Sequence, residues 1–224
     1  MKSNLHKDIT VITILFNTPK KKIYNLRQYK NFNLIIFEQG SPISSKNELK
    51  NVLGFKFNYY YSQSNLGLSK GINFLIKKTK TKYCLVTEPD IFIKEKSVIN
   101  LKKAIETDKK LLLLGPRYNK KKAKKNLKYT NKIDLSCVFF QTKKIKKFNF
   151  YDEDFFFFWT DVDLVKRINN SSFKMAVVQN SLASHLMSSS SNDKFYVNLL
   201  REKSYKYGEF IYDYKYGKLR LLKI

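Results

Sequence analysis

Residues 151–164 have the most distinctive composition in the chain, with the sequence YDEDFFFFWTDVDL. They hold five of the 18 acidic residues, although the formal net charge is +26. A local structural role is one interpretation: Thr160 would cap a helix over about 161–168, and Asp163 would pair with Arg167 four residues later. That role accounts for the start of a helix, but not for an acidic loop joined to an aromatic run.

The excess positive charge comes mainly from lysine. Lysine and arginine together number 44, and only five of them are arginine. A nucleic-acid partner would explain the charge, but such a protein needs aromatic residues interleaved with basic residues on one face. The aromatic residues here occur in apolar runs or beside acids, and arginine, the better residue for binding phosphates and bases, is scarce. We therefore attribute most of the lysines to a bias in composition.

The cysteines and the apolar segments indicate the compartment. Cys84 and Cys137 lie in apolar runs without a CxxC or Cys/His partner nearby, which predicts small buried thiols in a reducing compartment. The stretch 11–16 is too short for a signal peptide, and no run approaches the ~18 apolar residues of a membrane span. We expect a cytoplasmic location, which is compatible with a peripheral contact on the inner face of a membrane.

Short apolar runs alternate with helix-like segments through the first half of the chain. Runs rich in Ile, Val, Phe and Tyr predict strands at 11–16, 34–37, 55–61, 83–86 and 111–114. They are near-continuous rather than alternating, which is typical of a mostly parallel sheet covered on both faces. Apolar residues three to four apart predict helices at about 68–76 and 98–105. The pattern predicts an α/β fold.

The second half is less regular. Residues 117–132 contain eight basic residues and no acid, which predicts an exposed connection. Strand-like runs follow at 134–141 and 175–178, and residues 193–224 predict a helical tail that alternates aromatic and charged residues. Tyrosine and lysine in this tail suit the headgroup level of a membrane, while packing of the tail on the rest of the protein is an equally weighted alternative.

Three further groups of polar residues are candidates for chemistry. Glu88 and Asp90 directly follow the predicted strand 83–86, where two carboxylates can hold a hard divalent cation; a solvated proline turn is the alternative. His185 follows a strand-like segment, although a lone histidine is more often structural. Residues 65–73 predict a turn into a helix whose N-terminus would face a phosphate, which by itself is weak evidence.

The order of these features resembles the family 2 glycosyltransferases of the GT-A fold, especially the bacterial rhamnosyltransferase-like members. The resemblance runs from about 11 to 191, and its most specific part is 151–164, which is similar to the family motif Phe-Asp-Glu-x-Phe-Phe-x-Tyr-x-Glu-Asp-x-Asp-Leu. It implies a Rossmann-like, mostly parallel sheet flanked by helices. It also implies a catalytic domain over 1–192 and a basic, aromatic helical tail over 193–224. Within that domain it implies a nucleotide-binding half at 1–115, a basic connection at 116–132, and an acceptor and metal half at 133–192.

The resemblance also implies roles for individual residues. Asp161 matches the general base, Asp90 matches the last acid of the metal motif, and His185 matches a histidine near the metal and the diphosphate. The positions implied for the nucleotide are Asn17, Glu38, Asn65, Gly67, Asn73 and Glu88. Glu38 and Glu88 differ from the residues usual at their positions, and Thr160 replaces the glutamate that precedes the base.

The activity that the resemblance implies is inverting transfer of a sugar from a nucleotide-sugar donor, with Mn²⁺ or Mg²⁺ as cofactor. The acceptor would be a glycan or a lipid-linked molecule in the synthesis of a bacterial surface polysaccharide. Asp161 would remove the acceptor proton, and the cation on Asp90 would stabilise the leaving diphosphate. The alternatives are a GT-A-like fold that has lost activity, which Thr160 favours, and a basic protein that binds nucleic acid or membrane.

Overall fold

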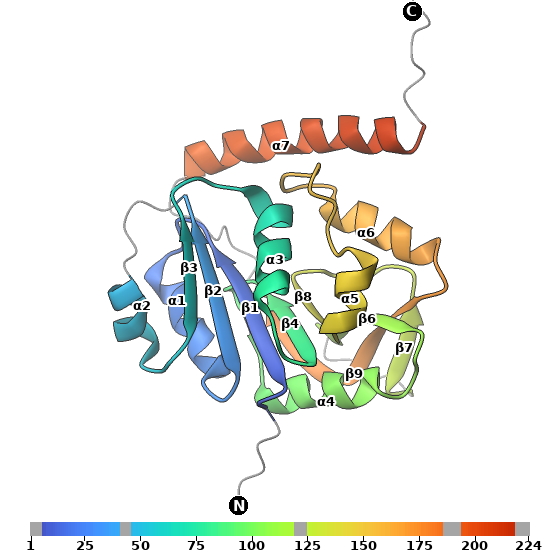
Figure 1. Cartoon of the computed structure of the whole chain (residues 1–224), viewed down its shortest axis with the longest axis horizontal. Coiled ribbons are helices and arrows are strands. Elements are labelled where there is room, and N and C mark those ends of the chain that lie inside the picture. Colours follow the sequence, from blue (N-terminus) through green and yellow to red (C-terminus); the bar gives the residue numbers. More distant parts are fainter. Residues whose placement is uncertain (1–5, 41–45, 119–124, 186–193, 218–224) are drawn as a thin grey trace, which may run out of the picture.

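A twisted mixed sheet with helices packed on both faces forms the core of the computed structural model (Figure 1). The structure describes residues 6–40, 46–118, 125–185 and 194–217, with side chains of the last segment from 198 onward. Among these residues the strand order is β3-β2-β1-β4-β8-β6-β9-β5, and β7 pairs with β9.

The elements have the following bounds. The strands are β1 (Ile9–Leu15), β2 (Asn33–Gln39), β3 (Asn58–Ser62), β4 (Tyr83–Thr87), β5 (Ile91–Ile93), β6 (Leu111–Arg117), β7 (Leu127–Thr130), β8 (Cys137–Gln141) and β9 (Lys174–His185). The helices are α1 (Lys20–Asn25), the 3₁₀ helix η1 (Leu26–Tyr29), α2 (Lys46–Leu53), α3 (Gly67–Lys78), α4 (Glu95–Ile105), α5 (Thr142–Phe148), α6 (Thr160–Asn169) and α7 (Lys194–Lys215).

Strand direction divides the sheet into two parts. The pairs β3–β2, β2–β1 and β1–β4 are parallel. A helical connection lies between each of the strands β1 to β4 and the next, as parallel strands require. Strand β8 then runs antiparallel to both β4 and β6, while β6 and β9 are parallel. The parallel part brings the carboxyl ends of β1, β2 and β4 to one end of the sheet, and α7 lies across that end (Figure 1).

The predicted strands are buried as their composition requires. Ile9, Val11 and Ile12 of β1 are fully buried, and so is most of β4. Cys84 and Cys137 are buried free thiols, as expected, and burial raises the pKa of both. The α/β class predicted from the apolar runs is confirmed.

Two expectations about the second half need correction or extension. The basic segment 117–132 is not only an exposed connection, because Leu127–Thr130 forms β7 and pairs with β9; residues 119–124 lie outside the described part. Strand β9 is longer than the expected run at 175–178.

The short helices α1, α2 and α5 were not predicted, since each offers few apolar positions for a periodic pattern.

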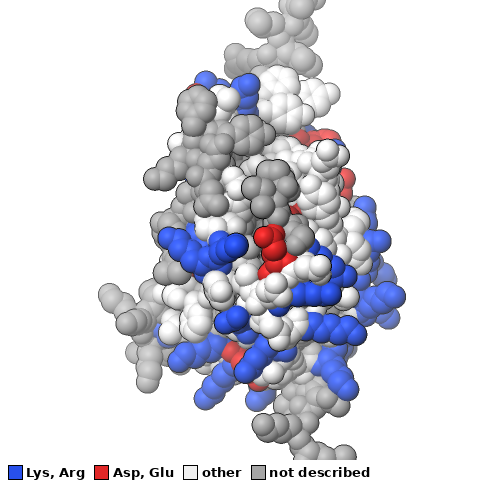
Figure 2. All heavy atoms as spheres, turned by 90° about the vertical axis from the view of Figure 1, so that its left-hand side faces the viewer, with Lys and Arg blue, Asp and Glu red and all other residues white. Residues whose placement is uncertain are grey.

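Many lysines and arginines lie on the face of the molecule that Figure 2 shows. Figure 2 shows them scattered across the visible face, separated by uncharged residues, with few acids between them. This distribution agrees with a bias in composition. Among the described residues, no helix combines the length and apolar character needed to cross a bilayer.

Candidate active site

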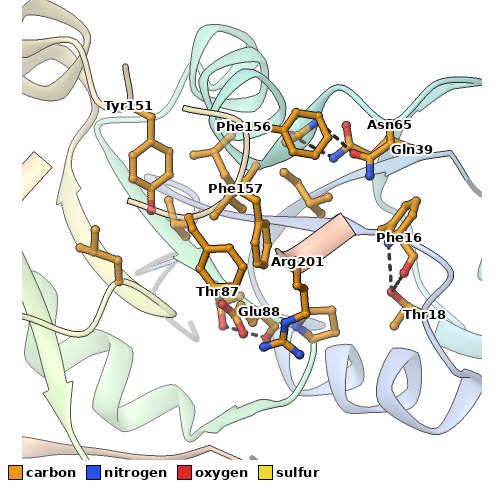
Figure 3. Close-up of a pocket in the computed structure, with 18 of the residues that line it drawn as sticks. Phe16, Thr18, Gln39, Asn65, Thr87, Glu88, Tyr151, Phe156, Phe157 and Arg201 are labelled. Atoms are coloured by element: carbon orange, nitrogen blue, oxygen red, sulfur yellow. Dashed lines mark hydrogen bonds between the residues drawn. The ribbon is translucent and has the colours of Figure 1, made fainter. Parts of the chain in front are cut away.

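A cavity of about 580 Å³ lies at the carboxyl ends of β1, β2 and β4. Ligands of α/β proteins bind at this end of the sheet, because the loops that leave the strands there are free to vary. The cavity is lined from β1 and its loop by Ile14, Phe16 and Thr18, and from the turn after β4 by Glu88 and Asp90. Other lining residues come from β2, β4, α3 and the loop before it, the aromatic run at 155–159, β9 and α7 (Figure 3).

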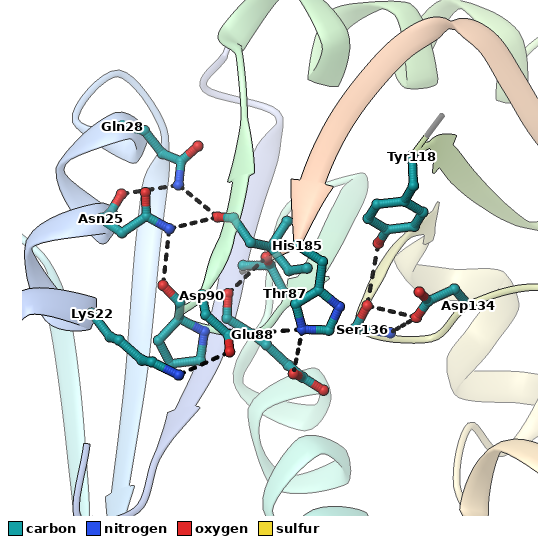
Figure 4. Close-up of polar contacts among 12 residues, drawn as sticks. Lys22, Asn25, Gln28, Thr87, Glu88, Asp90, Tyr118, Asp134, Ser136 and His185 are labelled. Atoms are coloured by element: carbon teal, nitrogen blue, oxygen red, sulfur yellow. Dashed lines mark hydrogen bonds and ion pairs between the residues drawn. The ribbon is translucent and has the colours of Figure 1, made fainter. Parts of the chain in front are cut away.

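Glu88, Asp90 and His185 come together at one side of this cavity. One ligand atom from each lies within 4.8 Å of the other two. The Nε2 atom of His185 is 3.5 Å from Asp90 Oδ1 and 3.6 Å from Glu88 Oε2 (Figure 4). The sheet brings them together, because β5 and β9 pair with Ile91 opposite His185.

This triad fits a divalent cation. Asp90 Oδ1 is buried and has no hydrogen-bond partner among the described atoms, which is costly for a carboxylate oxygen unless a cation satisfies it. Two carboxylates and one imidazole form a ligand set that suits Mn²⁺, and the carboxylates alone also suit Mg²⁺. The predicted metal ligands Asp90 and His185 are thus adjacent, and Glu88 joins them.

A buried lysine balances the charge of Asp90. Lys22 Nζ lies 3.0 Å from Asp90 Oδ2, and their side chains are 5% and 3% exposed. Since Lys22 occupies only Oδ2, Oδ1 remains directed toward Glu88 and His185 (Figure 4). Nothing in the sequence near Lys22 indicated this pairing, because the two residues are distant in the chain.

Helix α1, which carries Lys22, and the following helix η1 also hold the turn after β4. Asn25 Nδ2 donates to the backbone oxygens of Pro89 and Ile91, at 2.9 and 2.7 Å. Gln28 Nε2 donates to the same Ile91 oxygen, and Gln28 Oε1 accepts from the backbone N–H of Ile93. These bonds fix the turn in the conformation that presents both carboxylates to the cavity (Figure 4).

Electrostatics at the triad favour a cation. Partial loss of water and the like charge of Asp90 raise the pKa of Glu88, and the positive charges of Lys22 and Arg201 oppose the rise. A divalent cation would reverse this effect, because it stabilises the ionised carboxylate.

The loop before α3 forms the opposite wall of the cavity. Asn65 Oδ1 accepts from the backbone N–H of Gly67 at 2.9 Å, and Leu68 N–H donates to the Phe156 oxygen at 2.7 Å. Gly67 has φ +82°, and a Cβ there would lie 2.4 Å from the Phe156 oxygen. Glycine is therefore required at 67 for both the backbone conformation and the close contact with the aromatic run. Asn65 and Gly67, both predicted from the sequence, line the cavity.

The structure places Gln39, rather than Glu38, among the lining residues of the cavity. Gln39 Nε2 donates to the Gly67 oxygen, and its Oε1 accepts from Leu66 N–H. Successive residues of a strand point to opposite faces, so Glu38 points away from Gln39 and accepts from the Tyr59 hydroxyl at 2.9 Å. Burial raises the pKa of Glu38 to about 7.

Two other residues predicted to contact the nucleotide, Asn17 and Asn73, are not among the lining residues of the cavity. Asn17 has φ +46°, a left-handed conformation that asparagine tolerates, and it stands between the lining residues Phe16 and Thr18. Asn73 instead binds the segment after α5. It donates to the Tyr151 oxygen at 2.8 Å and to Glu153 Oε1 at 3.0 Å, and accepts from Tyr151 N–H. Asn73 thus attaches α3 to the acidic part of residues 151–164.

Asp161 lies in the first turn of α6, just after the aromatic residues Phe156–Phe158 that line the cavity. Its side chain is exposed and is not itself part of the lining. Within the described part of the chain, no hydrogen bond or ion pair involves the Asp161 carboxylate. Asp161 thus follows the cavity wall closely along the same segment of the chain.

Asp163 has a structural role, and the expected cap at Thr160 was wrong. Asp163 is buried; it accepts from Arg167 Nε at 2.7 Å and from the Tyr216 hydroxyl at 2.7 Å. The expected pair with Arg167 is confirmed. Helix α6 begins after Trp159, whose φ is +68°, and the Thr160 hydroxyl donates to the Phe157 oxygen instead of capping the helix.

The sequence analysis did not find Leu200 and Arg201, which reach the cavity from α7. In Figure 3 the Arg201 side chain lies beside Glu88. The only signal in the sequence was that Arg201 is one of five arginines among 44 basic residues. The tail is therefore not merely an appendage, because part of it lines the cavity.

Comparison with known proteins agrees with this geometry. The family model described as "Glycosyl transferase family 2" matches residues 20–168. A search of curated protein sequences found no match.

Two similar solved structures have the same fold. A mannosyltransferase from Pyrobaculum calidifontis, in complex with GDP-Man and Mn²⁺, has a TM-score of 0.67 and 10% identity, and the match covers 88% of this chain and 61% of that one. S. aureus TarS 1–349 has a TM-score of 0.58 and 12% identity, with 79% and 60% covered. The chain thus spans about 60% of the length of these relatives. With the match to the family model over most of its length, the chain belongs to glycosyltransferase family 2 and has the GT-A fold.

Proposed function

We propose that the protein is an inverting glycosyltransferase that uses a nucleotide-sugar donor and a divalent cation. The observation that carries this proposal is the Glu88, Asp90 and His185 triad in the cavity at the carboxyl ends of the strands. A second observation supports it: Asp90 Oδ1 is buried without a hydrogen-bond partner among the described atoms.

The donor would lie along the cavity wall. Asn65, Gly67 and Gln39 would contact the nucleoside part, since they line the side formed by β2 and α3. The diphosphate would then reach the triad at the turn after β4. A Mn²⁺ or Mg²⁺ ion bound there would act as a Lewis acid for the leaving diphosphate.

Asp161 would be the general base. In an inverting transfer, the acceptor oxygen attacks the anomeric carbon while the bond from that carbon to the diphosphate oxygen breaks, so one bond forms as the other is lost. The proton of the acceptor hydroxyl must leave in the same step, and a carboxylate within reach would take it. The exposure of Asp161 beside the aromatic wall supports this role, because an approaching acceptor finds its oxygens unoccupied by any described residue.

The identity of donor and acceptor is a finer proposal. The similar structures hold GDP-Man with Mn²⁺, UDP and UDP-GlcNAc, so guanosine and uridine nucleotides are the first candidates. We propose a hexose as the transferred sugar, and a glycan or lipid-linked molecule of a bacterial surface polysaccharide as acceptor.

The side chains on the outer face of α7 support the proposal that this helix contacts the cytoplasmic side of a membrane. Tyr207, Phe210 and Tyr214 are 51%, 56% and 63% exposed and share one side of the helix, since their spacings are three and four. The exposed Lys203 and Lys206 lie on the same side. Aromatic rings and lysines together suit the headgroup region of an anionic bilayer, which would bring the cavity near a lipid-linked acceptor.

A thermal-shift experiment tests the proposed function. UDP, GDP, dTDP and ADP are each added to the protein with Mn²⁺ or with EDTA. A ligand that binds only the folded state raises the melting temperature, so we expect one nucleotide to do so in Mn²⁺ and much less in EDTA. If no nucleotide raises the melting temperature with Mn²⁺, the proposal is wrong.

A further inference from the structure

Helix α7 lies outside residues 20–168, which the family model matches, and yet it reaches the cavity. Its residues Leu200 and Arg201 are part of the lining. Figure 3 shows the Arg201 guanidinium at the same side of the cavity as Glu88. The position of Arg201 in the cavity therefore needs an explanation that the family match does not provide.

The inner face of α7 is firmly docked on the aromatic run. Gly208 packs so closely on Trp159 that a Cβ at 208 would lie 2.7 Å from the indole ring and 2.9 Å from the Phe158 oxygen. Trp159 also packs against Tyr205 and Tyr212, with ring centroids 5.6 and 5.2 Å apart. These contacts recur at intervals of three and four residues, so they fix both the position and the rotation of the helix.

Further along, polar contacts hold the end of α7 on the acidic part of 151–164. Lys215 pairs with Asp152, and with Asp154 at 2.7 Å. The Tyr216 hydroxyl donates to Asp163 at 2.7 Å. Because the helix is attached at both its middle and its end, its rotation relative to the cavity is determined by packing.

This docking directs Arg201 inward. Ser204, one turn later, is buried and accepts from Phe158 N–H at 3.5 Å. The Arg201 guanidinium lies 5.9 Å from the centroid of the Phe158 ring, within the range of a cation–π contact. Arg201 is exposed to solvent, as Lys203 and Lys206 are, but its side chain lines the cavity near an aromatic ring of the wall and the carboxylate of Glu88.

The charge of the cavity shows what Arg201 can bind. Among the described lining residues, Arg201 is the one lysine or arginine. Lys22 is already held in a buried pair with Asp90. With Lys22 paired to Asp90, a divalent cation bound by Glu88 and Asp90 would leave one net positive charge, whereas the diphosphate of a nucleotide-sugar carries two negative charges. Among the described residues that line the cavity, the guanidinium of Arg201 supplies the positive charge that remains.

We propose that Arg201 binds the diphosphate of the donor, so that the C-terminal helix completes the active site. This inference rests on the proposed function and extends it to a residue outside the family match. Arginine suits the role better than lysine, because its planar group binds two phosphate oxygens at once. The protein has 39 lysines and five arginines, so an arginine at this position departs from its general composition.

The test compares Arg201→Met and Arg201→Lys with the outward-facing control Lys203→Met. Calorimetry in Mn²⁺ would measure binding of the nucleoside diphosphate that the wild type prefers and of the matching monophosphate. We expect Arg201→Met to lower the affinity for the diphosphate about 10- to 100-fold, because hydrogen bonds to a charged group are lost. The affinity for the monophosphate should fall much less. The diphosphate affinity of Arg201→Lys should lie between those of the wild type and Arg201→Met. Lys203→Met should bind both nucleotides as the wild type does.

The change in the ratio of diphosphate to monophosphate affinity separates binding from a merely structural role. If Arg201 only held α7 in place, Arg201→Met would lose affinity for both nucleotides by the same factor, and the inference would be wrong. It would also be wrong if Arg201→Met bound the diphosphate as tightly as the wild type, although the proposed function would then stand. If the wild type bound none of the four diphosphates in Mn²⁺, the proposed function itself would fail, and this inference with it. Should Arg201→Met not fold, Arg201→Lys gives the same comparison.

Discussion

Lys22 Nζ lies 3.0 Å from Asp90 Oδ2 in a buried pair beside the proposed cation site. Lys22→Met would leave the Asp90 carboxylate buried without its partner. The free energy of unfolding, measured by urea denaturation in EDTA, should fall by about 3–5 kcal/mol. Asp90→Asn should cost a similar amount, and the double variant Lys22→Met/Asp90→Asn should recover most of the loss because no buried charge remains. If the two losses simply added, the pair would not be the source of the stability.

The same double variant isolates the role of Asp90 in binding a cation. It should fold but lack the carboxylate that faces Glu88 and His185. In this variant, we expect that Mn²⁺ no longer enhances binding of the nucleoside diphosphate. His185→Gln should lower the affinity for Mn²⁺ by at least about tenfold. Titration with Mn²⁺ in the presence of the nucleotide measures both. Glu209→Gln, an exposed acid on α7, is the control and should behave as the wild type; equal Mn²⁺ affinity in all four proteins would contradict the site.

Asp161 and Asp163 provide a matched pair two residues apart. Asp161→Asn should lower the turnover of sugar transfer about 10²- to 10⁴-fold, because the amide cannot accept the acceptor proton, while leaving donor affinity and stability unchanged. Asp163→Asn should instead lower the melting temperature, since Asp163 binds both Arg167 and Tyr216. Turnover and melting curves of both variants distinguish the roles. Near-normal turnover in Asp161→Asn would exclude it as the base.

Glu38 makes stability depend on pH. Burial raises its pKa from the ordinary 4.5 to about 7, so the folded state holds its proton more tightly than the unfolded state does. This contribution is fully present below about pH 4.5 and is lost as the pH rises to about 7, for a decrease of up to about 3 kcal/mol. Glu38→Gln should not show this part of the decrease. Urea denaturation from pH 5 to 7.5, with Glu209→Gln as control, checks the difference; parallel curves for wild type and Glu38→Gln would contradict it.

The outer face of α7 can be tested apart from its inner face. Replacing Tyr207, Phe210 and Tyr214 by serine should reduce co-sedimentation with anionic vesicles, since these exposed rings would enter the headgroup region. Binding of the wild type should decrease with salt and be weak on neutral vesicles, because lysines supply part of the attraction. Tyr24→Ser, an exposed tyrosine on α1, is the control. If the triple variant sedimented as the wild type does, α7 would not be the contact.

Several features of the molecule could be predicted from local sequence. The apolar runs of β1 and β4 identified buried strands, because a strand covered on both faces needs continuous apolar residues. The acids after β4 were identified as candidates because polar residues directly after such a strand lie at a loop end of the sheet. The resemblance of 151–164 to the family motif identified the family, which the family model then supported independently.

Other features depended on contacts that local sequence does not encode. His185 meets Asp90 only because β5 and β9 pair with Ile91 opposite His185. Which of two adjacent residues of β2 enters the cavity was set by the phase of the strand, which places Gln39 there and Glu38 against Tyr59.

The sequence by itself thus determined the strongly apolar strands, among them β1, β2, β4 and β6, the helices α3 and α4, and the family, since these depend on residues close together in the chain. The tertiary structure alone decided that Lys22 pairs with Asp90 and that Arg201 faces the cavity. The pattern along α7 predicts a helix but not its rotation, which is fixed by the packing of Gly208 on Trp159. Packing between distant segments depends on the shapes of both surfaces, and no periodic pattern within one segment contains that information.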